Sequence, residues 1–248
     1  ARWLRFQGAD ADASLTNWKT PSEKATAVGT PPFTADQHYA GAAGLNYINL
    51  GLNADALQQN NLGEFVWYQT GHMKPGASQS GSTMGVINAS SQGLSIVPHN
   101  TNQIQLRCAG TTITIASASD GFGLIGASRF NSSEVQVFYN GVRRSTTANT
   151  SASLPALPIY LCGLNNNGSI SNGNVVTQSF LYLGEALTET EVRYLTAIVG
   201  EYLETIRYGE YYCEEPGIGT ASIVLQEQST LGVFVNTGSA TCAVTIIQ

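Results

Sequence analysis

The sequence predicts an all-β protein of the sandwich class that carries one amphipathic helix. About ten short runs of apolar or alternating residues recur along the chain, at the spacing typical of sandwich strands. Glycine is frequent, at 26 of 248 residues, and charged residues make up only 11%. This composition suits short strands joined by many turns. Sustained helical periodicity is confined to the end of the stretch 178–206.

Residues 1–45 predict an N-terminal strand followed by an extended arm. A strand-like pattern at residues 2–6 stops at Gly8. Residues 10–39 are rich in proline, glycine and other turn residues. A loop this long within a compact domain is usually functional or an extended arm. We interpret it as an arm that could lie on a neighbouring subunit.

The strongest strand pattern is at residues 63–70, where both faces are apolar. Phe65 and Trp67 fall on one face, and the apolar residues that alternate with them fall on the other, which is typical of a central strand covered on both sides. Asn140 and Gly141 predict a type I′ hairpin turn. Further strands are expected at residues 45–52, 83–88, 93–97, 104–108, 111–115, 121–127, 134–139, 159–164 and 175–183.

The helix is expected over residues 188–206. Thr188 and Glu191 form a capping-box pattern, and Glu189 adds negative charge at the positive end of the helix dipole. One apolar stripe recurs at three- and four-residue steps. Its members are Val192, Leu195, Ile198, Val199, Tyr202, Leu203 and Ile206. The stripe predicts a helix that packs on a sheet.

Residues 210–248 predict a small β appendage next to the main domain, residues 46–209. Three alternating runs, at residues 219–226, 231–236 and 242–247, are too few to fold securely alone, so we expect them to dock on this chain or on a partner. Cys213 and Cys242 flank this segment, and they form either a disulfide or free thiols. Cys108 and Cys162 fall in apolar or alternating runs, where buried free thiols are expected.

The charge balance argues against nucleic acid as a partner. The formal net charge is −6 and the chain has three lysines, so a surface that neutralises phosphates is not expected. An apolar run of the length that spans a membrane is also missing from the sequence.

The order of five segments resembles that of the concanavalin A-like (laminin-G-like) jelly-roll domains. These segments are YINLGLNAD, GEFVWYQTG, FGLIGASRFNSSEVQVFYNGV, IYLCGLNNNGS and QSFLYLGEALTETEVRYLTAIVGEYL. The family's strand-to-helix motif matches Leu183, Gly184, Ala186, Leu187 and Thr188, and its hairpin matches residues 138–142. The likeness spans residues 46–206 and is closest to domains of bacteriophage virion proteins and bacterial surface proteins.

Several glycan-cleaving enzymes share this fold, so paired acids are the pattern to seek. Glycosidases need two carboxylates about 5–9 Å apart across the bond that is cleaved. Every aspartate falls in an expected loop, and Glu64 and Glu134 are isolated strand acids. His38, His72 and His99 fall in loops and are interpreted as surface residues. We therefore expect no enzymatic activity.

Sugar binding needs flat aromatic rings and side-chain amides. The candidate residues are Trp67, Tyr68, His72, Tyr139, Asn165 and Asn166. For Trp67 the favoured interpretation is a core aromatic, and for the asparagines at residues 165–167 it is a turn. The family resemblance also implies calcium as an alternative ligand, through Asp120, Asn140, Asn165 and Asn167. Since carboxylates are few there and no cysteine has zinc-type spacing, we expect no metal or cofactor.

The resemblance and the low charge together predict a non-enzymatic structural protein of a bacteriophage particle. It would serve in capsid decoration, a tail or a fibre as a symmetric homo-oligomer, and would contact copies of itself, other virion proteins and host glycan. The alternative is an extracellular lectin or carbohydrate-binding module of bacterial polysaccharide-degrading machinery.

Overall fold

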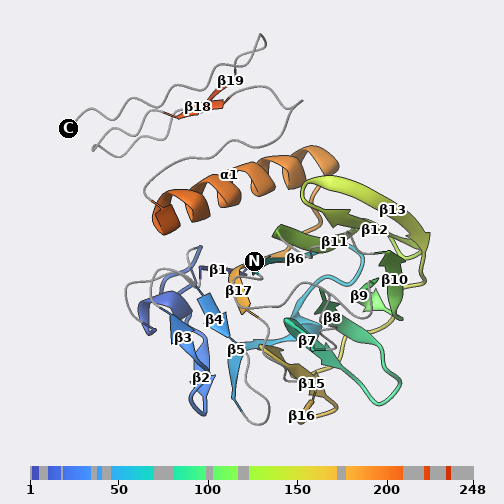
Figure 1. The fold of residues 1–248 in the computed structure, drawn as a ribbon. Helices are drawn as coiled ribbons and strands as arrows, with labels where there is room; N and C mark the ends of the chain where they lie inside the picture. The colour runs from blue at the N-terminus through green and yellow to red at the C-terminus, as the bar shows by residue number, and fades with distance from the viewer. Residues whose placement is uncertain are drawn as a thin grey trace. The chain divides into compact units, whose positions relative to one another are not determined.

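The computed structural model describes residues 2–5, 11–17, 19–34, 38–40, 46–69, 81–98, 103–116, 123–171, 177–208, 221–223 and 233–235. The chain divides into two units, Ala1–Leu203 and Glu204–Gln248. The first unit is a β-sandwich of two sheets with helix α1 on one side (Figure 1).

The first sheet has eight strands and carries the helix. Its order is β13 (Val142–Ala148), β12 (Glu134–Tyr139), β11 (Gly123–Arg129), β6 (Leu62–Gln69), β17 (Thr177–Gly184), β4 (His38–Ala40) and β3 (Phe33–Thr34), with β1 (Arg2–Arg5) also paired to β17. All of its pairs are antiparallel. Strand β6 lies between β11 and β17, which confirms its expected central position.

The second sheet has nine strands. Its order is β10 (Ile113–Ala116), β9 (Gln103–Gly110), β8 (Gly93–Val97), β7 (Met84–Ile87), β14 (Pro158–Leu161), β5 (Tyr47–Asn53) and β2 (Thr26–Val28). Strand β15 (Leu164–Asn166) pairs parallel to β7 and antiparallel to β16 (Ser169–Ser171). Two short 3₁₀ helices, η1 (Ala13–Leu15) and η2 (Ala54–Ala56), lie in the connections.

The main hydrophobic core lies between the two sheets. Alternate strand residues such as Ile48, Val66 and Leu106 point into it and are at most 1% exposed. Cys108 and Cys162 are buried free thiols, as expected. Burial raises the pKa of the Cys162 thiol to about 12, so it remains protonated at neutral pH.

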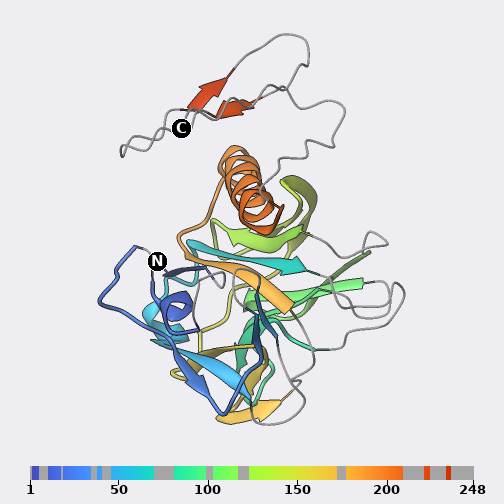
Figure 2. The same cartoon turned by 60° about the vertical axis from the view of Figure 1, so that its left-hand side comes forward.

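Helix α1 (Glu189–Tyr208) lies across the outer face of the eight-stranded sheet (Figures 1 and 2). Its expected capping box is present. The backbone N–H of Thr188 donates to Glu191 Oε2 at 2.8 Å, and the backbone N–H of Glu191 donates to Thr188 Oγ1 at 3.3 Å. A second core forms beneath the helix. It contains Phe65, Leu124, Phe138, Phe180, Tyr182, Val192, Leu195, Val199 and Leu203.

One member of the predicted stripe faces solvent. Ile198 is 50% exposed, because the sheet contacts only the arc of α1 that carries Val192, Leu195, Val199 and Leu203. A four-residue step on a helix also reaches positions beside the contact arc, so periodicity alone overestimated the buried stripe. The side chain of Ile206 lies outside the described part of the chain.

The link between β17 and α1 is tied to the sheet by backbone donors. The N–H of Leu187 donates to Ser128 Oγ at 3.0 Å, and that of Ala186 to Asn61 Oδ1 at 3.1 Å. The Tyr182 hydroxyl donates to the Glu185 carbonyl at 2.7 Å. These bonds fix where the helix starts, which gives a physical role to the strand-to-helix motif.

The β12–β13 hairpin forms at Asn140 and Gly141, as the sequence predicts. Their φ angles are +48° and +76°, which suit a type I′ turn. Asn140 Oδ1 also accepts the backbone N–H of Leu124 at 2.9 Å. The hairpin is thereby tied to the neighbouring strand β11.

The expected N-terminal arm supplies short strands to both sheets. Strand β2 pairs with β5, while β1 and β4 pair with β17. Strand β1 lies within the expected strand at residues 2–6. Strands β2, β3 and β4 have only two or three residues and pair through backbone groups, which need no side-chain alternation, so the sequence pattern does not reveal them.

In the second unit, β18 (Ala221–Ile223) and β19 (Val233–Val235) form an antiparallel pair. The third expected run, Cys213 and Cys242 lie outside the described residues. No helix within the described ranges is long and apolar enough to cross a membrane.

Candidate functional site

The outer face of the nine-stranded sheet is the main polar surface of the sandwich. Side chains that alternate with the core residues of its strands point away from the core. We call this surface the polar sheet face. Its polar and aromatic members are Thr26, Tyr47, Asn49, Ser95, Gln103, Gln105, Arg107, Thr114 and Tyr160.

Strand register aligns several of these residues in one row across the sheet. Thr26 pairs with Asn49, Asn49 with Tyr160, and Tyr160 with Gly85. Gly85 then pairs with Ser95, and Ser95 with Arg107. The row therefore contains hydroxyl groups, an amide, a phenol and a guanidinium, all of which can form hydrogen bonds.

Two tyrosines form the aromatic part of this face. The ring centroids of Tyr47 and Tyr160 lie 4.2 Å apart, with an angle of 31° between the ring planes. Tyr160 is 8% exposed and Tyr47 is half-buried, so Tyr47 presents the more accessible ring. Burial, followed by hydrogen bonding to Tyr47, raises the pKa of the Tyr160 phenol. The Tyr160 phenol is therefore a neutral hydrogen-bonding group at physiological pH.

Asn49 lies beside this aromatic pair. Its Oδ1 accepts the backbone N–H of Gly51 at 2.9 Å, which orients the amide. Among the described residues, its amide nitrogen has no hydrogen-bond partner. Asn49 therefore has a fixed orientation and a donor available to a ligand. We call Tyr47, Tyr160 and Asn49 the tyrosine platform.

Arg107 is the one charged residue in the nine strands of this sheet, which contain no Asp or Glu. Its Nη1 donates to Ser95 Oγ at 3.0 Å, and its Nε to the Ser91 carbonyl at 3.1 Å. Burial lowers the pKa of the Arg107 guanidinium.

Strand β15 covers the middle of the polar sheet face. A Cβ placed on Gly85 would lie 2.5 Å from Leu164 Cδ1, so Leu164 rests on the glycine backbone. Ser95 is fully buried next to it. The accessible parts of the face are therefore the tyrosine platform on one side of Leu164 and the strands β9 and β10 on the other.

Two of the predicted sugar-binding aromatics are packing residues. Trp67 is half-buried beneath α1, where a Cβ on Gly200 would lie 3.0 Å from its ring. Tyr139 is 6% exposed in the main core, with the Arg144 guanidinium 5.4 Å from its ring centroid.

The remaining candidates do not meet at one site in the described residues. Asn165 is fully buried, its Nδ2 donates to the Pro158 carbonyl, and its Oδ1 accepts the Gly168 N–H, so it holds a turn. Asn166 is exposed at the end of β15. The Tyr68 side chain and the whole of His72 lie outside the described part of the chain.

Sequence reasoning missed Tyr47 and Asn49. Both are in the expected strand at residues 45–52, whose alternation separates Tyr47 and Asn49 from Ile48 and Leu50. That alternation is the sequence feature from which their outward orientation could have been predicted. It identified an outward face, but it could not show that Tyr160 from a distant strand would lie beside Tyr47.

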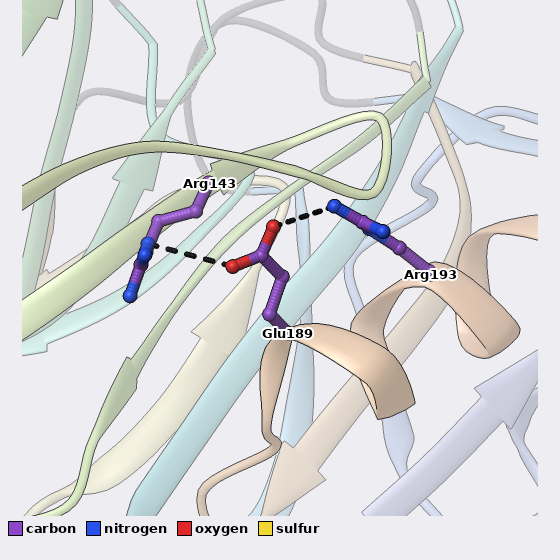
Figure 3. A network of polar contacts seen from close by, with 3 residues as sticks. All are labelled: Arg143, Glu189 and Arg193. Atoms are coloured by element: carbon purple, nitrogen blue, oxygen red, sulfur yellow. Dashed lines mark hydrogen bonds and ion pairs between the residues drawn. The ribbon is translucent and has the colours of Figure 1, made fainter.

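Among the described residues, the acids Glu64, Glu134 and Glu189 lie at separate places in the fold. Glu64 is fully buried between the sheets, and Glu134 is half-buried and accepts a hydrogen bond from Asn131 Nδ2 at 3.4 Å. Glu189 bridges two arginines at the start of α1 (Figure 3). Within the described ranges, no three His, Cys, Asp or Glu residues are grouped to hold a metal ion. Of the calcium candidates, Asn140 and Asn165 use their carbonyl oxygens within the fold, and Asp120 is not described.

Comparisons with known proteins identify the fold. No family model and no curated protein sequence matches the chain. Solved structures do match. The botulinum neurotoxin serotype D binding domain gives a TM-score of 0.54 at 8% identity, over 79% of this chain and 51% of that one.

Two further matches are of the same kind. The serotype G binding domain gives a TM-score of 0.53 at 12% identity, over 80% of this chain and 50% of that one. The receptor-binding domain of the mosaic serotype C/D gives 0.56 at 10% identity, over 79% and 50%. The chain thus spans about half the length of these structures.

Identities this low show a shared fold alone. The matching architecture consists of two mainly antiparallel sheets stacked on a common core, with one helix outside. This chain has the concanavalin A-like jelly-roll fold.

Proposed function

We propose that this chain is a non-enzymatic, lectin-like binding module that contacts a glycan through the tyrosine platform. The observation that carries the proposal is the accessible ring of Tyr47 beside the oriented amide of Asn49, on a sheet without acidic residues. Sugars are bound by aromatic rings that stack on the pyranose face and by amides that bond its hydroxyls.

The fold is compatible with this role. A structure with the same fold is described as the receptor-binding domain of a botulinum neurotoxin. Binding at an exposed sheet face needs no cofactor and no movement of the core. Catalysis by paired acids has no support in the described residues, because Glu64 is buried and Glu134 lies alone on its strand.

A glycan array followed by titration calorimetry tests this proposal. We expect Tyr47→Ala to weaken binding of the best glycan about tenfold through loss of stacking. Asn49→Ala should weaken it several-fold through loss of one hydrogen bond. Tyr194→Ala is the matched control, since Tyr194 is an exposed tyrosine (55%) on α1, away from this sheet. Failure of the folded chain to bind any glycan, or equal affinity of the Tyr47 variant and wild type, would contradict the proposal.

The role in a bacteriophage particle remains a prediction. It follows from the resemblance of the sequence to virion domains, as does the expectation of contacts with other virion proteins. Mass spectrometry of purified particles and electron microscopy of native material test it. The extracellular alternative predicts glycan binding by the isolated chain, which the array measures directly.

A further inference from the structure

Glu64 lies inside the sandwich, where an acid is unusual. Strand β6 places it between Leu62 and Val66 on the core-facing side, and its strand partners are Ala127 and Leu183. It is fully buried. The proposed binding role does not use this residue, so the following inference is independent of that role.

Among the residues that the structure describes, neither carboxyl oxygen of Glu64 has a hydrogen-bond partner. An ionised carboxylate in such a place loses its hydration and gains no hydrogen bond in return, which disfavours the charged form. The uncharged acid form avoids most of this cost. The geometry therefore favours a protonated side chain.

The charged and titratable groups that interact with Glu64 come from two strands, and Arg107 does so from the outer side of its sheet. Arg129 on β11 directs its guanidinium to other acceptors: Nε donates to the Cys108 carbonyl at 2.7 Å, and Nη2 to Asn149 Oδ1 at 2.6 Å. Arg107 on β9 is engaged with Ser91 and Ser95. The Cys108 thiol donates to the Leu62 carbonyl at 3.7 Å.

The two arginines only partly offset the effect of burial on the pKa of Glu64. Burial raises the pKa of Glu64 well above its ordinary value, and the charges of Arg129 and Arg107 lower it in part. Both arginines act at a distance, since neither donates a hydrogen bond to the carboxyl group. The pKa of the Cys108 thiol is also raised, chiefly by burial, so the thiol is neutral.

We propose that Glu64 is a protonated carboxylic acid in the folded chain, and that its ionisation makes the sandwich sensitive to rising pH. At low pH the Glu64 side chain is neutral and stays buried between the two sheets. At high pH the Glu64 carboxylate ionises, and it must then either remain buried without a hydrogen-bond partner or reach solvent through opening of the core. The fold thus contains a pH-sensitive element that stabilises it in acidic surroundings.

The direction of the pH effect on stability follows from the difference in proton binding between the folded and the unfolded chain. Below the ordinary pKa of a glutamate, Glu64 is protonated in both states, and its contribution to stability is fully present. As the pH rises, the unfolded chain loses this proton first. The folding equilibrium constant then falls by up to tenfold per pH unit until the folded state ionises as well.

Denaturant unfolding from about pH 5 to about pH 9 tests this for wild type, Glu64→Gln and Glu134→Gln. Glu134→Gln is the matched control, because it removes the same formal charge from a half-buried strand position. We expect the folding constant of wild type and Glu134→Gln to fall with pH, relative to Glu64→Gln, by up to tenfold per unit. Parallel pH profiles of all three proteins would overturn the proposal.

Infrared spectroscopy provides a direct second measurement. A carbonyl-stretch band of a protonated carboxylic acid should be present in folded wild type at neutral pH and absent from the Glu64→Gln spectrum. If Glu64→Gln does not fold, Glu64→Leu replaces it, since leucine removes both unpartnered oxygens at similar volume. The proposal fails if wild type shows no such band at neutral pH.

Discussion

The outer faces of the two sheets have opposite chemistry, although both belong to one sandwich. On the eight-stranded sheet, Phe65, Phe138 and Tyr182 form an apolar surface that α1 covers. On the nine-stranded sheet, the outer face carries hydroxyls, amides, two tyrosines in ring contact and one arginine. The helix therefore buries one outer face in a second core, whereas the other outer face keeps its polar side chains.

The largest expected effect is on the helix-covered face. Phe65 is fully buried, with its ring centroid 6.0 Å from that of Phe138 and 6.1 Å from that of Tyr182. Phe65→Ala should lower the free energy of unfolding by about 3–5 kcal/mol, because it leaves a cavity beneath α1.

Chemical denaturation followed by circular dichroism measures this change. Asn49→Ala, on the polar sheet face, is the contrasting variant and should change the free energy of unfolding by at most about 0.5–1 kcal/mol. Similar losses in the two variants would show that the faces do not differ as described.

The next effect concerns the start of the helix. Thr188→Ala removes the capping hydroxyl and should lower the free energy of unfolding by about 1 kcal/mol. Thr190→Ala, at an exposed helical position two residues later, is the control and should cost less. Thermal melting monitored at the helical signal distinguishes the two variants.

The same cap has a pH dependence opposite to that of Glu64. Hydrogen bonds from the side chain and backbone of Thr188 lower the pKa of Glu191. The cap therefore stabilises the fold above the unfolded pKa of a glutamate, and this contribution is lost as the pH falls through the folded pKa. Equal acid sensitivity of Thr188→Ala and wild type would contradict the assignment.

The smallest effect is expected at the ion pairs of Figure 3. Glu189 Oε1 lies 2.8 Å from Arg193 Nη2, and Oε2 lies 3.5 Å from Arg143 Nε on β13. These groups are substantially solvent-accessible, so Arg143→Ala should lower the free energy of unfolding by about 0.2–1 kcal/mol. The loss should shrink at high salt. A salt-independent loss would indicate that packing of the Arg143 side chain, and not its charge, connects β13 to α1.

The sequence predicted those parts of the fold that follow from local pattern. The central strand β6, the hairpin at Asn140 and Gly141 and the cap at Thr188 all agree with the structure. Each depends on residues close together in the chain, so spacing alone carries the information.

The candidate site depended on contacts that local pattern does not encode. Tyr47 and Tyr160 come from strands far apart in sequence that become neighbours only through sheet order. Trp67 and Tyr139 are aromatic residues of the kind that sugar-binding sites use. In the fold, however, Trp67 packs against the helix and Tyr139 lies in the main core. The face that each residue occupies depends on which side the core covers, and this is a property of the whole sandwich.

Hydrogen–deuterium exchange with and without a saturating glycan tests most directly whether the polar sheet face is the contact surface. We expect slower exchange at residues 47–53 and 158–161 in the presence of the glycan, and unchanged exchange at residues 189–203 of α1. Protection along α1 without protection of β5 and β14 would contradict the account.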